Sequence, residues 1–262
     1  MASLAKEVVL ITGANSGIGY ELARQLLSKG SYHVLLGARS ADRGTTALHT
    51  IQSQHPQHSP NISFLPLDLA SDTSITAATT HITTTHGRLD IIINNAAVAS
   101  YTAPDRSAFR TAFDTNATGP YLLTKSLISL LRQSPNPRIV NVSSGAGSIG
   151  RRLTPASPMY KIQAEPYRAS KVAMNMLTAC LYVEYGLNYG VEGEEAKEGE
   201  ERRVKVFAYD PGFTISNLSK ANTVENGARS AEETVRSLVE VVEGRRDGEV
   251  GRFLHNTGEY PW

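Results

Sequence analysis

The stretch that decides the fold is residues 7–19, EVVLITGANSGIG, in which five apolar or β-branched residues run into three closely spaced glycines. Such an unbroken apolar run is typical of a strand buried on both faces. Gly13, Gly17 and Gly19 have the spacing Gly-x-x-x-Gly-x-Gly and open a helix-like segment, 17–29. Glycine permits a tight turn and lets backbone N–H groups approach a phosphate at a helix N-terminus. The stretch therefore predicts a strand–turn–helix unit that binds a pyrophosphate.

Short β-like runs and helix-like segments alternate along the rest of the chain. The expected strands are 7–12, 33–37, 62–67, 89–94, 138–143, 204–209 and 252–255, and the expected helices are 17–29, 41–54, 71–86, 106–133 with a break near Gly119-Pro120, 167–187 and 227–243. Alternating helices and buried strands favour one parallel sheet between helical layers. We expect an α/β fold, a doubly wound (Rossmann) parallel seven-stranded sheet in a three-layer α/β/α sandwich, with 1–262 forming a single domain.

Composition excludes several classes of protein. Lys and Arg number 26 and Asp and Glu 25, so the net charge is +1 and no general attraction to nucleic acid or anionic membranes is expected. Cys180 is the single cysteine, which excludes an internal disulfide and a Cys-based zinc site. His49, His55 and His58 lack carboxylate partners at ligand spacing, so no metal is expected. No stretch resembles a membrane span or a signal peptide, and we expect a cytoplasmic protein.

Two residues at strand ends bear on cofactor choice. An acidic residue after the second strand would bind the ribose 2′-hydroxyl of NAD, but this chain has Arg39 there. An arginine fork pairs well with a 2′-phosphate, so NADP(H) is favoured over NAD(H). Asp68 follows the third strand, where ligands bind in open α/β sheets. The alternative for Asp68 is that it caps the next helix.

Tyr167 and Lys171 stand at i and i+4 in the segment YRASK and share one helix face. A cation one turn away lowers the pKa of a phenol, which can then exchange a proton with a carbonyl or alcohol oxygen. A separate apolar stripe follows at Ala173, Met176, Leu177 and Cys180. The spacing predicts that this stripe faces the core, with Cys180 buried, and that the Tyr/Lys pair lies off it.

Taken together in chain order, these motifs resemble the short-chain dehydrogenase/reductase family. Besides the glycine turn and YRASK, the resemblance rests on NNAA at 94–97, DTNATG at 114–119, IVNVSS at 139–144 and DPGFTIS at 210–216. Ala97, Thr214 and Ser216 depart from the family's usual Gly, Val and Thr. The carbonyl-reductase branch is favoured by GARS at 37–40, by GRFLHNTGEYPW at 251–262 and by the long interval between Ser144 and Tyr167.

The resemblance implies a catalytic group of Asn116, Ser144, Tyr167 and Lys171. Tyr167 would deliver the proton, Ser144 would stabilise the substrate oxygen, Lys171 would tune Tyr167 and bind the nicotinamide ribose, and Asn116 would hold a water of the proton relay. Ser143 is the second choice for the serine. The implied cofactor-binding residues are Gly13, Asn15, Ser16, Gly17, Ile18, Gly19, Arg39, Asp68, Leu69, Asn95, Ala96, Tyr167, Lys171, Pro211, Gly212, Thr214 and Ser216.

The sequence thus predicts an NADPH-dependent reductase of a ketone or aldehyde. The alternatives are NAD-dependent oxidation of a secondary alcohol and a non-catalytic, dinucleotide-binding redox sensor. The loops near 97–104, 145–166 and 213–226 would form the substrate pocket, with 213–226 as a small lid. Tyr101, Met159, Tyr160 and Phe213 in these loops favour an apolar or aromatic small-molecule substrate. The resemblance allows a homodimer or homotetramer, and the sequence leaves the oligomeric state open.

Overall fold

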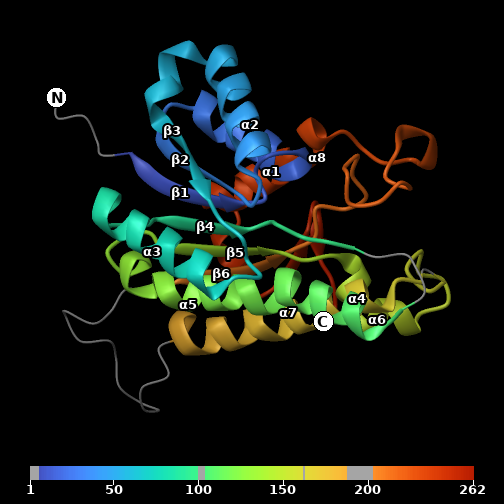
Figure 1. Ribbon diagram of the computed structural model, residues 1–262. Helices are drawn as coiled ribbons and strands as arrows, with labels where there is room; N and C mark the ends of the chain where they lie inside the picture. Colours follow the sequence, from blue (N-terminus) through green and yellow to red (C-terminus); the bar gives the residue numbers. More distant parts are fainter. Residues whose placement is uncertain (1–5, 100–103, 162, 188–202) are drawn as a thin grey trace.

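An eight-stranded sheet forms the centre of the computed structural model, which describes residues 6–99, 104–161, 163–187 and 203–262 (Figure 1). The strands are β1 (Glu7–Thr12), β2 (Tyr32–Ala38), β3 (Ile62–Pro66), β4 (Ile91–Asn94), β5 (Arg138–Val142), β6 (Lys205–Tyr209), β7 (Phe253–His255) and β8 (Gly258–Glu259). Their order is β3-β2-β1-β4-β5-β6-β7-β8, and all neighbours but the last pair are parallel. This confirms the doubly wound α/β sandwich.

Helices cover both faces of the sheet, as Figure 1 shows. They are α1 (Gly17–Ser28), α2 (Ala41–Gln54), α3 (Asp72–His86), α4 (Arg106–Phe113), α5 (Gly119–Leu131), α6 (Ile149–Leu153), α7 (Glu165–Leu181) and α8 (Ala231–Val242), with 3-10 turns at Pro56–Asn61, Gly145–Gly147, Val224–Asn226 and Asp247–Glu249. Alternate side chains of β1 point to opposite faces of the sheet. Val9 and Ile11 pack with α1, α2 and α8 on one face, whereas Val8 and Leu10 pack with α3, α5 and the end of α7 on the other. None of the described helices is both long and apolar enough to cross a bilayer. The cytoplasmic location stays a prediction.

The sheet has one strand more than the seven expected. Residues 256–257 form a tight turn, and β8 folds back antiparallel onto β7, pairing Leu254 with Glu259 and His255 with Gly258. A two-residue strand is too short to show a hydrophobic pattern, so the sequence analysis missed it. The parallel strands begin and end within two residues of the predicted bounds.

The buried face of α7 is the reverse of the one predicted. Tyr167 and Lys171 are 9% and 2% exposed and face the sheet with Met174, Thr178 and Leu181. The predicted apolar stripe faces outward: Met176 is 65% exposed, Ala173 and Leu177 are half-buried, and Cys180 is exposed rather than buried. The apolar stripe does not predict the buried face of this helix, because that face carries polar side chains. Their burial is possible because they form hydrogen bonds with groups at the strand ends.

The predicted break in the helix 106–133 is a π-helical turn, Asp114–Thr118, between α4 and α5. The N–H of Gly119 bonds to the carbonyl of Asp114, five residues back. Pro120, in the first turn of α5, has no N–H for the carbonyl four residues before it, which belongs to Asn116. The wider turn brings Asn116, fully buried, to the end of β4.

Candidate active site

The glycine turn between β1 and α1 is locked to the end of β4. Gly13 has φ +66°, and a Cβ there would lie 2.8 Å from Cα of Ala96. The hydroxyl of Thr12 accepts hydrogen bonds from the backbone N–H groups of Asn95 and Ala96, both 3.0 Å long, and the Asn95 amide donates to the Thr12 carbonyl at 2.8 Å. Thr12 joins the two strand ends, a role that the sequence analysis did not assign. Its polar side chain at the end of an apolar strand was the available signal.

The N-terminus of α1 is open toward a pocket. The side chain of Ser16, the N-cap residue of α1, forms no hydrogen bond with the first helical turn, and that turn contains no acidic residue. Gly17 has φ +56°, a left-handed conformation that glycine adopts without strain. Free N–H groups and the positive end of the helix dipole suit a phosphate. The residues present therefore fit the diphosphate of a dinucleotide.

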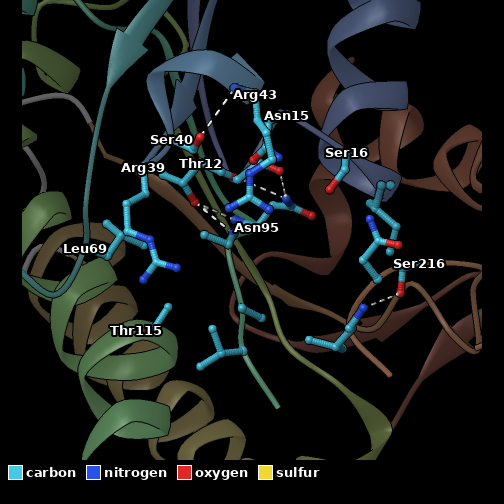
Figure 2. Close-up of a pocket in the computed structure, with 18 of the residues that line it drawn as sticks. Thr12, Asn15, Ser16, Arg39, Ser40, Arg43, Leu69, Asn95, Thr115 and Ser216 are labelled. Carbon is cyan, nitrogen blue, oxygen red and sulfur yellow. Dashed lines mark hydrogen bonds between the residues drawn. The ribbon is translucent and has the colours of Figure 1, made fainter. Parts of the chain in front are cut away.

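This pocket runs across the carboxyl ends of β1, β2, β3 and β4 (Figure 2). Of the predicted cofactor-binding residues, eleven line it: Gly13, Asn15, Ser16, Gly17, Ile18, Arg39, Asp68, Leu69, Asn95, Ala96 and Ser216. Further lining residues are Thr12, Ser40, Arg43, Leu67, Ala97, Val98, Thr115, Asn217 and Leu218. Gly19, Pro211, Gly212, Thr214, Tyr167 and Lys171 are not among its lining residues. A Cβ on Gly19 would lie 2.5 Å from the Asn95 amide nitrogen, so this glycine allows α1 to approach β4 closely.

Arg39, Ser40 and Arg43 lie along one side of the pocket, opposite Ser16 and Ser216 (Figure 2). Arg39 follows β2, and Ser40 is the N-cap of α2, accepting a hydrogen bond from the N–H of Arg43 at 3.4 Å. The two guanidinium groups give this end of the pocket a positive charge suited to a phosphate.

Asp68 lies at the pocket edge but is not the cap of the next helix. Ser71 caps α3, accepting from the N–H of Ser74 at 3.2 Å, which corrects the alternative considered for Asp68. The Asp68 carboxylate instead accepts from the N–H of Ala70 at 3.0 Å and closes the turn after β3. That turn keeps Asp68 and Leu69 at the pocket wall.

Lys171 reaches from α7 to the end of β5. Its Nζ donates to the carbonyl of Val142 at 2.7 Å and lies 5.8 Å from the centre of the Tyr167 ring. Burial lowers the pKa of this ammonium from 10.5 to about 8, and the negative charge of Asp210 acts in the opposite direction. Lys171 thus places a buried positive charge beside the phenol of Tyr167.

The two serines after β5 have different surroundings. Ser143 is 3% exposed and donates to the amide oxygen of Asn175 at 2.5 Å. Ser144 is half-buried, and its hydroxyl oxygen accepts from the N–H of Ala146 at 3.2 Å. The Ser144 proton is not used in that bond, since a hydroxyl oxygen that accepts can still donate. Ser144 therefore keeps its hydroxyl proton available for a further hydrogen bond, whereas Ser143 has used its own.

Asn116 connects the π-turn to the end of β4 and to α7. Its amide oxygen accepts from the N–H of Val98 and its amide nitrogen donates to the Val98 carbonyl, both at 2.8 Å. The same nitrogen donates to the hydroxyl of Ser170 at 3.0 Å, one residue before Lys171. Asn116 therefore fixes the pocket wall and the helix that carries Tyr167 and Lys171.

Leu218 connects the pocket to the tyrosine. Tyr167 packs with Ala146 and Ala164, and Ala99, Met159 and Leu218 lie against that cluster. Leu218 also lines the pocket, so the pocket leads toward Tyr167. Tyr160 and Phe213 are 40% and 45% exposed, and Tyr101 lies outside the described residues.

In the segment after β6, Thr214 is part of the buried packing and Ser216 faces the pocket. Thr214 is 2% exposed, and its hydroxyl bonds to Thr234 at 3.0 Å and to the carbonyl of Gly212 at 3.0 Å. Ser216 faces the pocket and accepts from the Asn222 amide at 3.0 Å. Within the described residues, no three metal-ligating side chains gather as a metal site would require.

Comparison with known proteins gives the family. The family model described as short chain dehydrogenase matches residues 7–226. This chain belongs to the short-chain dehydrogenase/reductase family. It is an oxidoreductase of that family, whose members bind a nicotinamide dinucleotide and act on small molecules.

Relatives and solved structures extend along nearly the whole chain. Short-chain dehydrogenase anuI of Penicillium roqueforti is 38% identical over 248 residues, covering 91% of this chain and 89% of that protein. An NADPH-bound carbonyl reductase from chicken fatty liver has a TM-score of 0.78 at 25% identity, covering 100% of this chain and 96% of that one. A short chain dehydrogenase from Shigella flexneri, complexed with NADP, has a TM-score of 0.76 at 19% identity, covering 97% and 98%, and shows the fold alone.

Proposed function

We propose that this protein reduces a ketone or aldehyde to an alcohol with NADPH as the hydride donor. The observation that carries the proposal is the buried Lys171 ammonium, which lies beside the ring of Tyr167 and is bonded to the end of β5, two residues before Ser144. A proton donor, a hydroxyl donor and a cation beside one another suit the polarisation and protonation of a carbonyl oxygen.

The charge near Arg39 supports NADP(H) over NAD(H). Arg39 and Arg43 line the pocket at the end of β2, where a 2′-phosphate on the adenosine ribose would lie in a doubly wound fold. The carbonyl reductase with a similar structure carries NADPH, which supports the same choice.

Each residue of the group has a role in the reduction. When bound, the dinucleotide supplies a hydride from nicotinamide C4 to the carbonyl carbon. Tyr167 donates its hydroxyl proton to the carbonyl oxygen, so that the product is an alcohol and the oxidised cofactor. Ser144 donates a hydrogen bond to the same oxygen as negative charge develops on it. The Lys171 ammonium stabilises the phenolate left on Tyr167. Asn116 holds a water molecule of the proton relay that returns a proton to Tyr167.

The substrate end of the site is apolar. Met159, Leu218 and Ala99 lie against the cluster that contains Tyr167, and Phe213, the first residue of the predicted lid 213–226, is exposed. Apolar walls around a few polar groups are typical of small-molecule sites. They support a ketone or aldehyde with an apolar body.

The test is a panel of ketones and aldehydes with NADPH, using wild type, Tyr167→Phe and Tyr182→Phe. Loss of the phenol should lower kcat at least about 100-fold, because a positioned acid contributes that much. Tyr182, in the π-turn after α7, lies outside the pocket and its variant should keep wild-type rates. Equal turnover by Tyr167→Phe and wild type would contradict the proposal. Turnover of secondary alcohols with NAD⁺ alone would favour the dehydrogenase, and cofactor binding without any turnover would favour the sensor.

A further inference from the structure

Asp210 is a buried carboxylate that the proposed chemistry leaves without a role. It directly follows β6 and is 7% exposed. Its N–H donates to the carbonyl of Leu254 in β7 at 2.8 Å, and the carbonyl of the preceding Tyr209 accepts from the N–H of Ser143 at 2.7 Å. The hydrogen bonds to β5 and β7 therefore place Asp210 at the strand ends where Ser144 and Lys171 also lie.

The carboxylate borders the backbone that carries Ser144. One oxygen, Oδ1, accepts from the N–H of Gly212 at 2.9 Å. The other, Oδ2, lies only 3.0 Å from the place where a Cβ on Gly145 would be. Burial raises the pKa of Asp210, and the N–H groups of Gly212 and Gly145 and the charges of Arg151 and His255 act against that rise. Since N–H donors surround it, the group is suited to accept hydrogen bonds as an ionised carboxylate.

Arg151 and Tyr260 enclose the same place from the other side. The Arg151 guanidinium lies 4.0 Å from the centre of the Tyr260 ring, and its Nε is buried without a hydrogen-bond partner among the described residues. A Cβ on Gly145 would lie 3.3 Å from the Tyr260 ring and 3.4 Å from that Nε. The ring stacks on His255 at 4.3 Å. This packing holds Asp210 against Gly145.

The turn that Asp210 borders also contacts Lys171. Residues Gly145–Gly147 form one 3-10 turn, and a Cβ on Gly147 would lie 2.8 Å from the backbone of Lys171. Burial lowers the pKa of the Lys171 ammonium, and Asp210 is the charged group that acts against this. One short turn thus lies between the carboxylate and the lysine.

We propose that Asp210 is a positioning residue of the active site: it fixes the backbone after Ser144, provides the counter-charge of the Lys171 ammonium, and is held in place by Arg151 and Tyr260. The inference rests on the proposed reduction for its kinetic readout. It assigns a function to the Asp of the DPGFTIS segment, which the sequence analysis treated only as part of a cofactor-binding motif.

The first test is Asp210→Asn, which keeps the shape of the side chain and removes its charge. Without the carboxylate, Lys171 loses its proton at lower pH, so the alkaline limb of kcat against pH should move down by about one pH unit. Because the pKa of Lys171 is about 8, this shift nearly halves its protonated fraction at pH 7, so kcat there should fall about twofold, with the Kd of NADPH within about threefold of wild type. Glu259→Gln is the matched control, because this neighbouring carboxylate is exposed and pairs with Arg252 at 2.9 Å. An alkaline limb that stays in place in Asp210→Asn overturns the proposal.

A second variant covers the case in which Asp210→Asn fails to fold. Arg151→Met removes the cation beside Asp210, which favours the protonated carboxyl and should move the alkaline limb in the same direction. Arg236→Met is the control, because Arg236 is exposed on α8 and pairs with Glu232 at 3.7 Å, and it should leave the limb unchanged. An unchanged limb in Arg151→Met also overturns the proposal.

A readout without turnover separates this inference from the proposed function. In protein with ¹³C-labelled lysine, the Cε resonance of Lys171 should titrate at lower pH in Asp210→Asn, or in Arg151→Met, than in wild type. If wild type reduces no carbonyl compound, the proposed function fails while this titration still decides the role of Asp210. Equal titration of Lys171 in wild type and both variants refutes the counter-charge.

Discussion

Replacing Lys171 by methionine removes a charge from the interior, and we expect it to stabilise the fold while abolishing carbonyl reduction. The side chain is 2% exposed, and burial lowers its pKa from 10.5 to about 8. That difference corresponds to about 3 kcal/mol by which the folded state disfavours the ammonium. The methionine variant also loses the hydrogen bond to the Val142 carbonyl, which costs about 1 kcal/mol. The net expectation is a gain of about 2 kcal/mol at pH 7.

The sign of the pH dependence follows from proton binding. Between pH 8 and 10.5 the unfolded chain holds a proton on Lys171 that the folded chain has lost, so the stability of wild type rises with pH. Lys171→Met has no such rise. The stability advantage of the variant should therefore shrink by about 2.5 kcal/mol between pH 7 and pH 10, and disappear.

Urea unfolding of cofactor-free protein at several pH values measures this difference directly. Lys29→Met is the matched control, because Lys29 is exposed and lies at the C-terminal end of α1, the opposite end of that helix from the glycine turn. Its stability relative to wild type should vary little with pH. A difference between Lys171→Met and wild type that stays constant from pH 7 to pH 10 would refute the reasoning, since it would mean that the folded state does not disfavour the ammonium.

Four other substitutions test separate parts of the site. Arg39→Ala should raise the KM of NADPH by about 10- to 100-fold and leave that of NADH within about threefold, because only the former carries the 2′-phosphate; equal effects on both cofactors in steady-state kinetics would contradict the assignment. Gly119→Ala would place a Cβ 2.1 Å from the carbonyl oxygen of Leu69 and should cost about 1–3 kcal/mol in urea unfolding, whereas wild-type stability would show that the contact relaxes freely. Ser144→Ala should lower kcat about 100-fold or more with little change in stability. Ser143→Ala should instead lose about 1–3 kcal/mol of stability and keep most of its turnover. If Ser143→Ala loses turnover and Ser144→Ala loses only stability, Ser143 is the catalytic serine and Ser144 the structural one.

The sequence predicted the order of the elements well because buried strands leave unbroken apolar runs. The runs ending at Thr12, Asn94 and Tyr209 each end a strand at the residue predicted. The position of Arg39 after β2 also follows from chain order alone, since the carboxyl ends of parallel strands share one edge.

The faces of α7 could not be predicted in the same way. Periodicity assigns apolar residues to the core, but Thr178 and Asn175 are buried because they form hydrogen bonds with Asn141 on β5 and with Ser143 just after it. Such pairing joins residues more than thirty positions apart, and no local pattern records it. The same holds for Thr12, whose role depends on a neighbouring strand.

The π-turn at Asp114–Thr118 has a consequence for how this chain tolerates deletion. A π-turn contains one residue more than the α-helical turn it replaces. Removing one residue elsewhere in a helix rotates everything beyond it by about 100°. Removing one within 114–118 would instead restore regular winding and leave the core-facing side of α5 in register. The shortened chain would keep its fold and lose the contacts of Asn116 with Val98 and Ser170. The extra residue is therefore needed for the site and not for the stability of the fold.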